Sequence, residues 1–158
     1  MGKLEEISKR NDELKGEGDN VVADGNQKLE EAQEFKGALD GLDIFDEDAG
    51  AIQEAATESA KEVASEQAEN TIEKPMDDVT GSFTENAEAA DTYSGTEREN
   101  ANKVSDAVGD YSSVGSTAQG EFNEHANQFE EARNMADNLS NEFSGKANDM
   151  VGRLEGMF

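Results

Sequence analysis

Histidine and clustered carboxylates are the side chains of this sequence that could carry out chemistry. His125 is the single histidine, and the chain contains no cysteine. Glu121 and Phe129 stand one helical turn before and after His125, and no serine nucleophile lies at a recognised motif spacing from it. The sequence therefore predicts a surface histidine on an amphipathic helix and no catalytic residue.

The carboxylates do not form a recognisable metal or acid–base site either. Residues 43–48 carry a dense acidic cluster, but they lack the alternating ligands, central glycine and terminal glutamate of a calcium-binding EF-hand loop. Adjacent pairs such as Glu130 and Glu131 diverge around a helix, because consecutive helical residues point in different directions. The glycines form neither a phosphate loop nor a dinucleotide-binding motif. We expect no metal, no cofactor and no small-molecule substrate, so the protein is not predicted to be an enzyme.

The net charge of −25 limits the classes of partner. It excludes nonspecific binding to nucleic-acid backbones, which requires clustered Lys and Arg, and it disfavours anionic membrane surfaces. Three interpretations remain: a solvated acidic surface, complementarity to a basic partner, and adaptation to high salt. The sequence has neither an apolar run of membrane-spanning length nor an N-terminal signal peptide. The expected location is the cytoplasm, or outside the cell by a route that reads no cleaved signal.

The elements that would position these residues are long helices. Apolar residues in the last third of the chain recur every three or four residues, which is the period of a helix with one buried face. This stripe comprises Ala101, Val104, Val108, Tyr111, Val114, Ala118, Phe122, Ala126, Phe129, Ala132, Ala136, Leu139, Phe143, Ala147, Met150, Leu154 and Phe158. It needs an apolar cover, either from the same chain or from a partner.

Composition agrees with a helical fold and a thin core. The chain has one proline, 34% apolar residues and 6% aromatic residues. Proline interrupts helices, so its scarcity favours long ones. The predicted class is all-α: an elongated antiparallel helical hairpin or a small helical bundle with long amphipathic helices.

Breaks in the apolar pattern divide the chain into two predicted parts. Residues 1–46 would form an N-terminal helical extension of two short helices, because glycines and turn formers at residues 15–20 interrupt the pattern. Residues 47–158 would form a long helical hairpin. Its turn is expected near residues 93–96, where Gly95 could end one helix.

Two further irregularities are expected within this hairpin. Pro75 lacks a backbone donor and restrains the residue before it, which predicts a kink or a junction of two helices. Asp77 and Asp78 would then lie in the first turn of the second helix. Residues 109–120 are dense in glycine and serine, which leaves both a short break and a continuous helix open.

Residues 50–150 resemble the ESX-type Trp-X-Gly helical-hairpin family and its Leu-X-Gly relatives, which are substrates and partners of bacterial type VII secretion. The resemblance rests on two amphipathic arms, an acidic composition without cysteine, the missing signal peptide, and Tyr93-Ser94-Gly95 at the expected turn. Tyrosine stands there in place of the family's tryptophan, and the family's export signal, Tyr-X-X-X-Asp/Glu after the second arm, is absent from the C-terminus. The resemblance implies a helical partner or targeting subunit of a secreted protein.

The predicted function is helix–helix pairing without catalysis, as a type VII secretion-associated substrate, partner or targeting subunit. The predicted partner interface consists of Phe83, Phe122, Phe129, Leu139, Phe143, Met150 and Leu154, with Tyr93 and Gly95 as the turn motif. The partner would be another helical protein or a second copy of this chain. The alternatives are a self-assembling helical-bundle or coiled-coil subunit, and an acidic mimic of nucleic acid that binds a basic protein.

Overall fold

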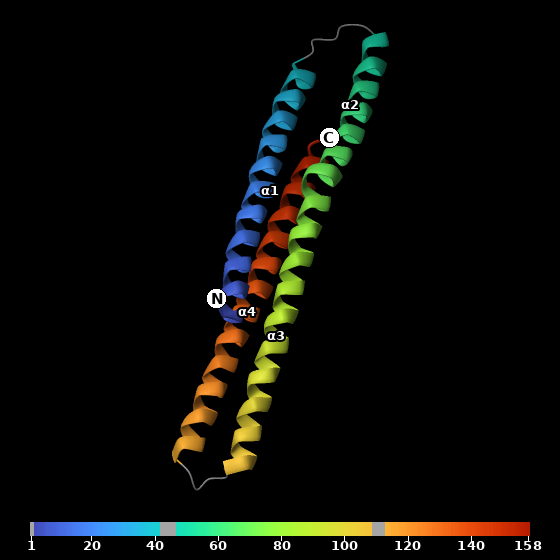
Figure 1. Ribbon diagram of the computed structural model, residues 1–158. Coiled ribbons are helices and arrows are strands. Elements are labelled where there is room, and N and C mark those ends of the chain that lie inside the picture. Colours follow the sequence, from blue (N-terminus) through green and yellow to red (C-terminus); the bar gives the residue numbers. More distant parts are fainter. Residues whose placement is uncertain (1, 42–46, 109–112) are drawn as a thin grey trace. The chain divides into compact units, whose positions relative to one another are not determined.

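The structure is a computed structural model that describes residues 2–41, 47–108 and 113–158, and within these ranges it contains helices and no strand. The elements are listed here in chain order: α1 (Lys3–Asp40), α2 (Glu47–Gln67), the π-helical segment η1 (Ala68–Glu73), α3 (Lys74–Val108) and α4 (Ser113–Gly156) (Figure 1). The predicted all-α class with long helices is confirmed. None of the helices in the described ranges holds a stretch that is both long and apolar enough to span a bilayer.

The contacts divide the chain into two compact units. Unit 1 consists of Met1–Lys15 and Gly81–Asn141, and unit 2 consists of Gly16–Thr80 and Glu142–Phe158. This grouping differs from the predicted division into an N-terminal extension and a hairpin. Residues of α1, α3 and α4 contribute to both units, because the N-terminal helix packs with segments of the later helices and does not stand apart from them.

Unit 1 is a bundle of three helical segments. Its hydrophobic cluster contains Ile7 of α1, Ala90 of α3, and Phe129 and Ala132 of α4. The segments of α3 and α4 are antiparallel, since Ser94 contacts Ala126 while the earlier residue Asp91 contacts the later residue Arg133. The segment of α1 runs parallel to α4, because Ile7 packs with Phe129 and Asn11 bonds to Ala132.

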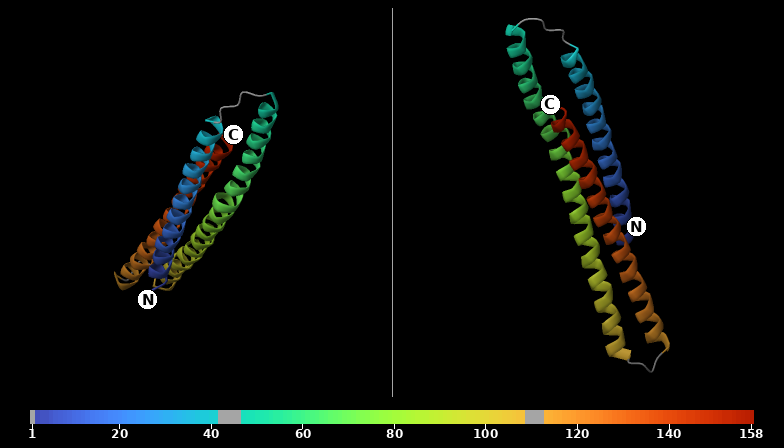
Figure 2. Two further views of the ribbon diagram at one scale, coloured as in Figure 1. Left: turned by 90° about the horizontal axis from the view of Figure 1, so that it is seen from above. Right: turned by 180° about the vertical axis from the view of Figure 1, so that it is seen from behind.

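Unit 2 is a second bundle, made by α1, by α2 continuing through η1 into α3, and by the end of α4 (Figure 2). Its buried apolar residues are Leu29, Leu39, Ala60, Ala64, Ala68, Ile72, Met76, Val79, Phe143, Ala147, Met150 and Leu154. Many of these are alanines, which agrees with the thin core that the composition predicts.

The predicted helix break at residues 15–20 is wrong, because α1 continues from Lys3 to Asp40. The cause is packing at Gly18, which is buried in unit 2. A Cβ atom at this position would lie 2.8 Å from atoms of the Phe143 ring, so the missing side chain lets α4 approach α1 closely. The burial of a whole aromatic side chain exceeds the helix-propensity cost of a glycine, which is about 1 kcal/mol.

The predicted turn at residues 93–96 is also wrong, because these residues lie within α3. The ring of Tyr93 stacks on Phe129 with the ring centroids 5.4 Å apart. The Thr92 and Thr96 hydroxyls donate to carbonyls one turn earlier in the helix, so neither needs a turn to satisfy it. The packing of this segment against α4 therefore outweighs the tendency of its residues to form a turn.

α3 ends at Val108 and α4 begins at Ser113, and residues 109–112 between them lie outside the described residues. The predicted irregularity at residues 109–120 is thus only partly described. From Ser113 onward α4 is helical through Gly120, so glycine and serine do not interrupt it there.

The predicted junction at Pro75 is present. The π-helical segment η1 ends at Glu73, and Pro75 and Asp77 lie in the first turn of α3. Proline has no N–H to donate to the carbonyl four residues earlier, and its ring crowds that carbonyl. A π-helical turn relieves this conflict, so the chain continues as a helix past the proline.

Candidate functional site

The residues predicted to form a partner interface lie mostly in the core of their own chain. Phe83, Phe129, Phe143, Met150 and Leu154 are buried. The remaining two, Phe122 and Leu139, are half-buried. The apolar stripe is therefore covered mostly by other residues of the same chain. The predicted interface is not a free surface. Tyr93 is half-buried in unit 1, and Gly95 is exposed on α3.

An open apolar groove lies instead in unit 2, between α1, α2 and the end of the chain. Its lining residues are Lys28, Glu31, Ala32 and Phe35 of α1, Ala60, Val63, Ala64 and Gln67 of α2, and Leu154 and Phe158 at the C-terminal end. The groove has a volume of ≈ 280 Å³. The lining is mainly apolar, which is the usual character of a surface that receives another helix or an apolar ligand.

Large apolar side chains remain in contact with water in this groove and on the same face of α2 outside it. Phe35 is 50% exposed and Val63 is 56% exposed. Ile52 stands on the same face of α2 as Val63, about three helical turns earlier, and is 66% exposed. Most monomeric proteins scatter such residues singly, whereas these three lie on two neighbouring helices of one unit.

Residues near the C-terminal end line part of the groove. The rings of Phe35 and Phe158 lie with their centroids 6.2 Å apart and their planes tilted by 56°. The Lys36 ammonium is 5.9 Å from the centroid of the Phe158 ring, within the range of a cation–π contact. Leu154 is buried and lines the groove together with both rings. The groove therefore has an aromatic wall where α4 ends at Gly156.

The rim of the groove is acidic. Among the described residues that line it, Lys28 is the one cation, and its ammonium lies 3.3 Å from the Glu31 carboxylate, which offsets its charge. Glu34 follows Glu31 by three residues on α1, and Glu66 follows Val63 by three residues on α2. Residues three apart are neighbours on a helix surface, so both edges of the groove carry exposed carboxylates.

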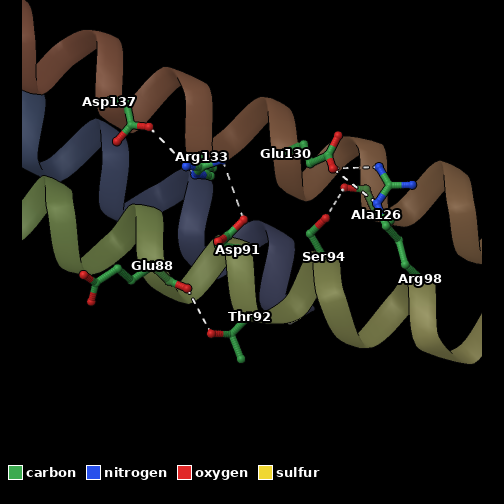
Figure 3. Close-up of polar contacts among 9 residues, drawn as sticks. All are labelled: Glu88, Asp91, Thr92, Ser94, Arg98, Ala126, Glu130, Arg133 and Asp137. Carbon is green, nitrogen blue, oxygen red and sulfur yellow. Dashed lines mark hydrogen bonds and ion pairs between the residues drawn. The ribbon is translucent and has the colours of Figure 1, made fainter.

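The polar contacts of unit 1 have a different role. Arg98 donates to Glu130 at 2.7 Å, Arg133 pairs with Asp91 at 3.7 Å, and the buried Ser94 hydroxyl donates to the Ala126 carbonyl at 3.1 Å (Figure 3). Each contact joins α3 to α4. These residues therefore hold the two helices of unit 1 in one pairing.

The side chains considered first for chemistry are not assembled for a reaction. His125 is largely exposed, with Nδ1 3.8 Å from a Glu97 carboxylate oxygen and its ring edge against Phe129. No group of three or more His, Asp or Glu side chains converges on a metal-sized site in the described ranges. The side chains of the acidic cluster at residues 43–48 lie outside what the structure describes.

The sequence contained a signal for the groove, although periodicity alone could not identify it. Phe35 and Val63 both lie on the helical apolar patterns of their segments. A pattern shows which residues share a helix face, but it does not show which part of that face another helix leaves uncovered.

Comparisons extend the description no further. The chain matches no family model, no curated protein and no solved structure. The inference of function therefore rests on the geometry of the groove and on the charge around it.

Proposed function

We propose that this protein is a non-enzymatic helical interaction protein, and that it pairs with a partner helix through the apolar groove of unit 2. The observation that supports this most strongly is the exposure of Phe35, Ile52 and Val63 on adjacent helices. The proposal keeps the predicted kind of function and moves its surface from the stripe of α4 to the groove.

The groove has the form that a helix requires. In unit 2, a Cβ atom built at Gly25 of α1 would meet both Met150 of α4 and Ile72 of η1, so these three helical segments pack together there. The groove lies beside the end of α4, with α1 (Lys3–Asp40) and α2 (Glu47–Gln67) as its two long walls. A partner helix that followed the line of α4 would restore three-helix packing there.

The free energy still available at the groove is moderate. Full burial of a side chain of this size contributes about 1.5–3 kcal/mol, and Phe35, Val63 and Ile52 retain half or more of their exposed area. The three side chains together therefore offer about 4 kcal/mol before ordering costs. Such a surface favours pairing that needs further contacts for affinity.

The test compares one position in the groove with one outside it. A photocrosslinking amino acid replaces Val63, and in a matched control it replaces Met135, which is 54% exposed in unit 1. In the native host, position 63 is expected to crosslink to a helical segment of another protein, and Val63→Asp is expected to abolish that complex in size-exclusion chromatography. Equal crosslinking from position 135 would contradict the proposal. Phe129→Asp is unsuitable as a test, because Phe129 is a core residue of unit 1.

The link to type VII secretion remains a separate part of the proposal. Its support is the helical architecture together with the acidic, cysteine-free composition. Tyr93-Ser94-Gly95 adds nothing to it, because these residues lie within α3. The test is whether the protein appears in the culture medium of its host and disappears when the secretion ATPase is deleted.

A further inference from the structure

We propose that the helix received by the groove is a basic amphipathic helix of another protein. This inference rests on the proposed function and specifies the chemistry of the partner. Its apolar stripe would cover Phe35, Val63 and Ile52, and Lys or Arg residues on both flanks of the stripe would face the acidic rims.

The rims define the charge that a partner must carry. Glu31 lines the groove on α1, and exposed Glu34 is its neighbour on the helix surface. On α2, exposed Glu66 is the neighbour of the lining residue Val63. Lys28 adds little positive potential, because its ammonium is paired with Glu31 at 3.3 Å. A helix with cations on one flank could pair with the carboxylates of one rim only. A helix with cations on both flanks could pair with the carboxylates of both rims. Charge complementarity of this kind raises the association rate and selects the partner.

The same charges disfavour a second copy of this chain as the occupant. Pairing groove to groove would bring together two chains that each carry a net charge of −25. It would also place the rim carboxylates of one copy near those of the other. Like charges held together at an interface oppose association, so the apolar face is protected from self-pairing and is open to a cationic partner.

The experiment uses two synthetic helices with an identical apolar stripe and opposite flanking charges. One carries Lys and Arg on both flanks, the other carries Glu, and each ends in one tryptophan. The protein contains no Trp, so tryptophan fluorescence reports the peptide alone. With the full chain, the basic helix is expected to bind at least about tenfold more tightly than the acidic helix, and added salt is expected to reduce this preference.

Two sets of variants separate the rim from the groove. Glu31→Gln, Glu34→Gln and Glu66→Gln together keep the apolar lining and are expected to remove most of the preference for the basic helix. The matched control changes Glu121, Glu124 and Glu131 to Gln, which alters the net charge equally at exposed positions of unit 1. Phe35→Ser with Val63→Ser is expected to weaken both peptides. Circular dichroism checks the fold, and the surface Glu→Gln variants provide a test that does not alter the core.

Each alternative outcome has a defined meaning. Equal binding of both peptides, lost in Phe35→Ser with Val63→Ser, would overturn the basic partner and leave helix pairing intact. Basic binding that survives the Ser variants and falls equally in both Gln sets would show diffuse attraction, and would overturn the groove as the site. A stable dimer in sedimentation that Val63→Asp dissociates would assign the groove to a second copy. Absence of binding by either peptide would overturn the basic helix as occupant.

Discussion

Two buried asparagines tie together the three helical segments of unit 1. The Asn86 side-chain amide donates to the Ile7 carbonyl at 3.1 Å and to the side-chain oxygen of Asn11. The Asn11 amide donates in turn to the Ala132 carbonyl at 3.2 Å. Both side chains are nearly inaccessible to water. A polar pair of this kind has partners in only one register of α1, α3 and α4, so it selects that register.

The sequence held a recognisable sign of this pair. Leu4, Ile7 and Leu14 form the apolar spacing of the first segment, and Asn11 occupies the position between them that the period assigns to the core. A polar residue at a core position is a known device for fixing register. Its partner could not be predicted, because Asn86 is 75 residues away and only the fold brings the two together.

Replacement of one asparagine is expected to cost more than replacement of both. Asn86→Leu removes the donor to the Asn11 side-chain oxygen and to the Ile7 carbonyl, and should lower the free energy of unfolding by about 1–3 kcal/mol. Asn11→Leu with Asn86→Leu should recover most of that loss, but should broaden the NMR spectrum as alternative registers become populated. Urea denaturation measures the first effect, with exposed Asn141→Leu as control. A double variant less stable than either single variant would contradict this reasoning.

At the scale of helices, glycine is where local turn propensity and helix packing favour different structures. Periodicity correctly predicted long amphipathic helices, and Pro75 correctly predicted a junction. Turn-forming residues at 15–20 and 93–96 incorrectly predicted a helix break and a hairpin turn. Gly18 serves close packing, and Gly95 lies on an open helix surface, so neither ends a helix. Composition alone cannot separate these roles from a turn, because each depends on what the neighbouring helix places opposite the glycine.

Alanine at these two glycines is expected to have opposite effects. Gly95 has no neighbouring heavy atom within 4 Å of a built Cβ, so Gly95→Ala should raise the free energy of unfolding by about 0.5–1 kcal/mol. Gly18→Ala would meet the Phe143 ring at 2.8 Å and should lower it by about 1–3 kcal/mol. Urea unfolding followed by circular dichroism measures both. Destabilisation by Gly95→Ala would instead indicate a turn at residues 93–96.

For the whole molecule, charge carries more functional information than periodicity. The net charge of −25 predicted a basic partner as one open interpretation, and the acidic rims of the groove now give that interpretation a location. The groove itself could not be predicted, because it depends on how α1, α2 and α4 pack together, which periodicity does not show. The proposed function combines the two, because an apolar lining would supply affinity and the carboxylates would select the partner.

The same charge predicts how salt changes stability. Exposed ion pairs such as Lys146 with Glu142 at 3.2 Å contribute only about 0.2–1 kcal/mol each, and salt weakens them. The chain has 38 acidic and 13 basic residues, and repulsion among the excess carboxylates opposes the compact state. Salt weakens this repulsion as well. Because the excess of negative charge is so large, relief of repulsion should dominate.

Thermal unfolding is therefore expected at higher temperature as ionic strength rises from about 0.01 M to about 0.2 M, where the screening length shortens from about 30 Å to below 10 Å. Sodium and potassium chloride should act equally, because screening depends on ionic strength and not on the cation. Over the same range the basic helix should bind the groove more weakly. A fall in the unfolding temperature would mean that attractive ion pairs outweigh repulsion. If salt raises the unfolding temperature and also weakens binding of the basic helix, the same acidic charges explain the two effects.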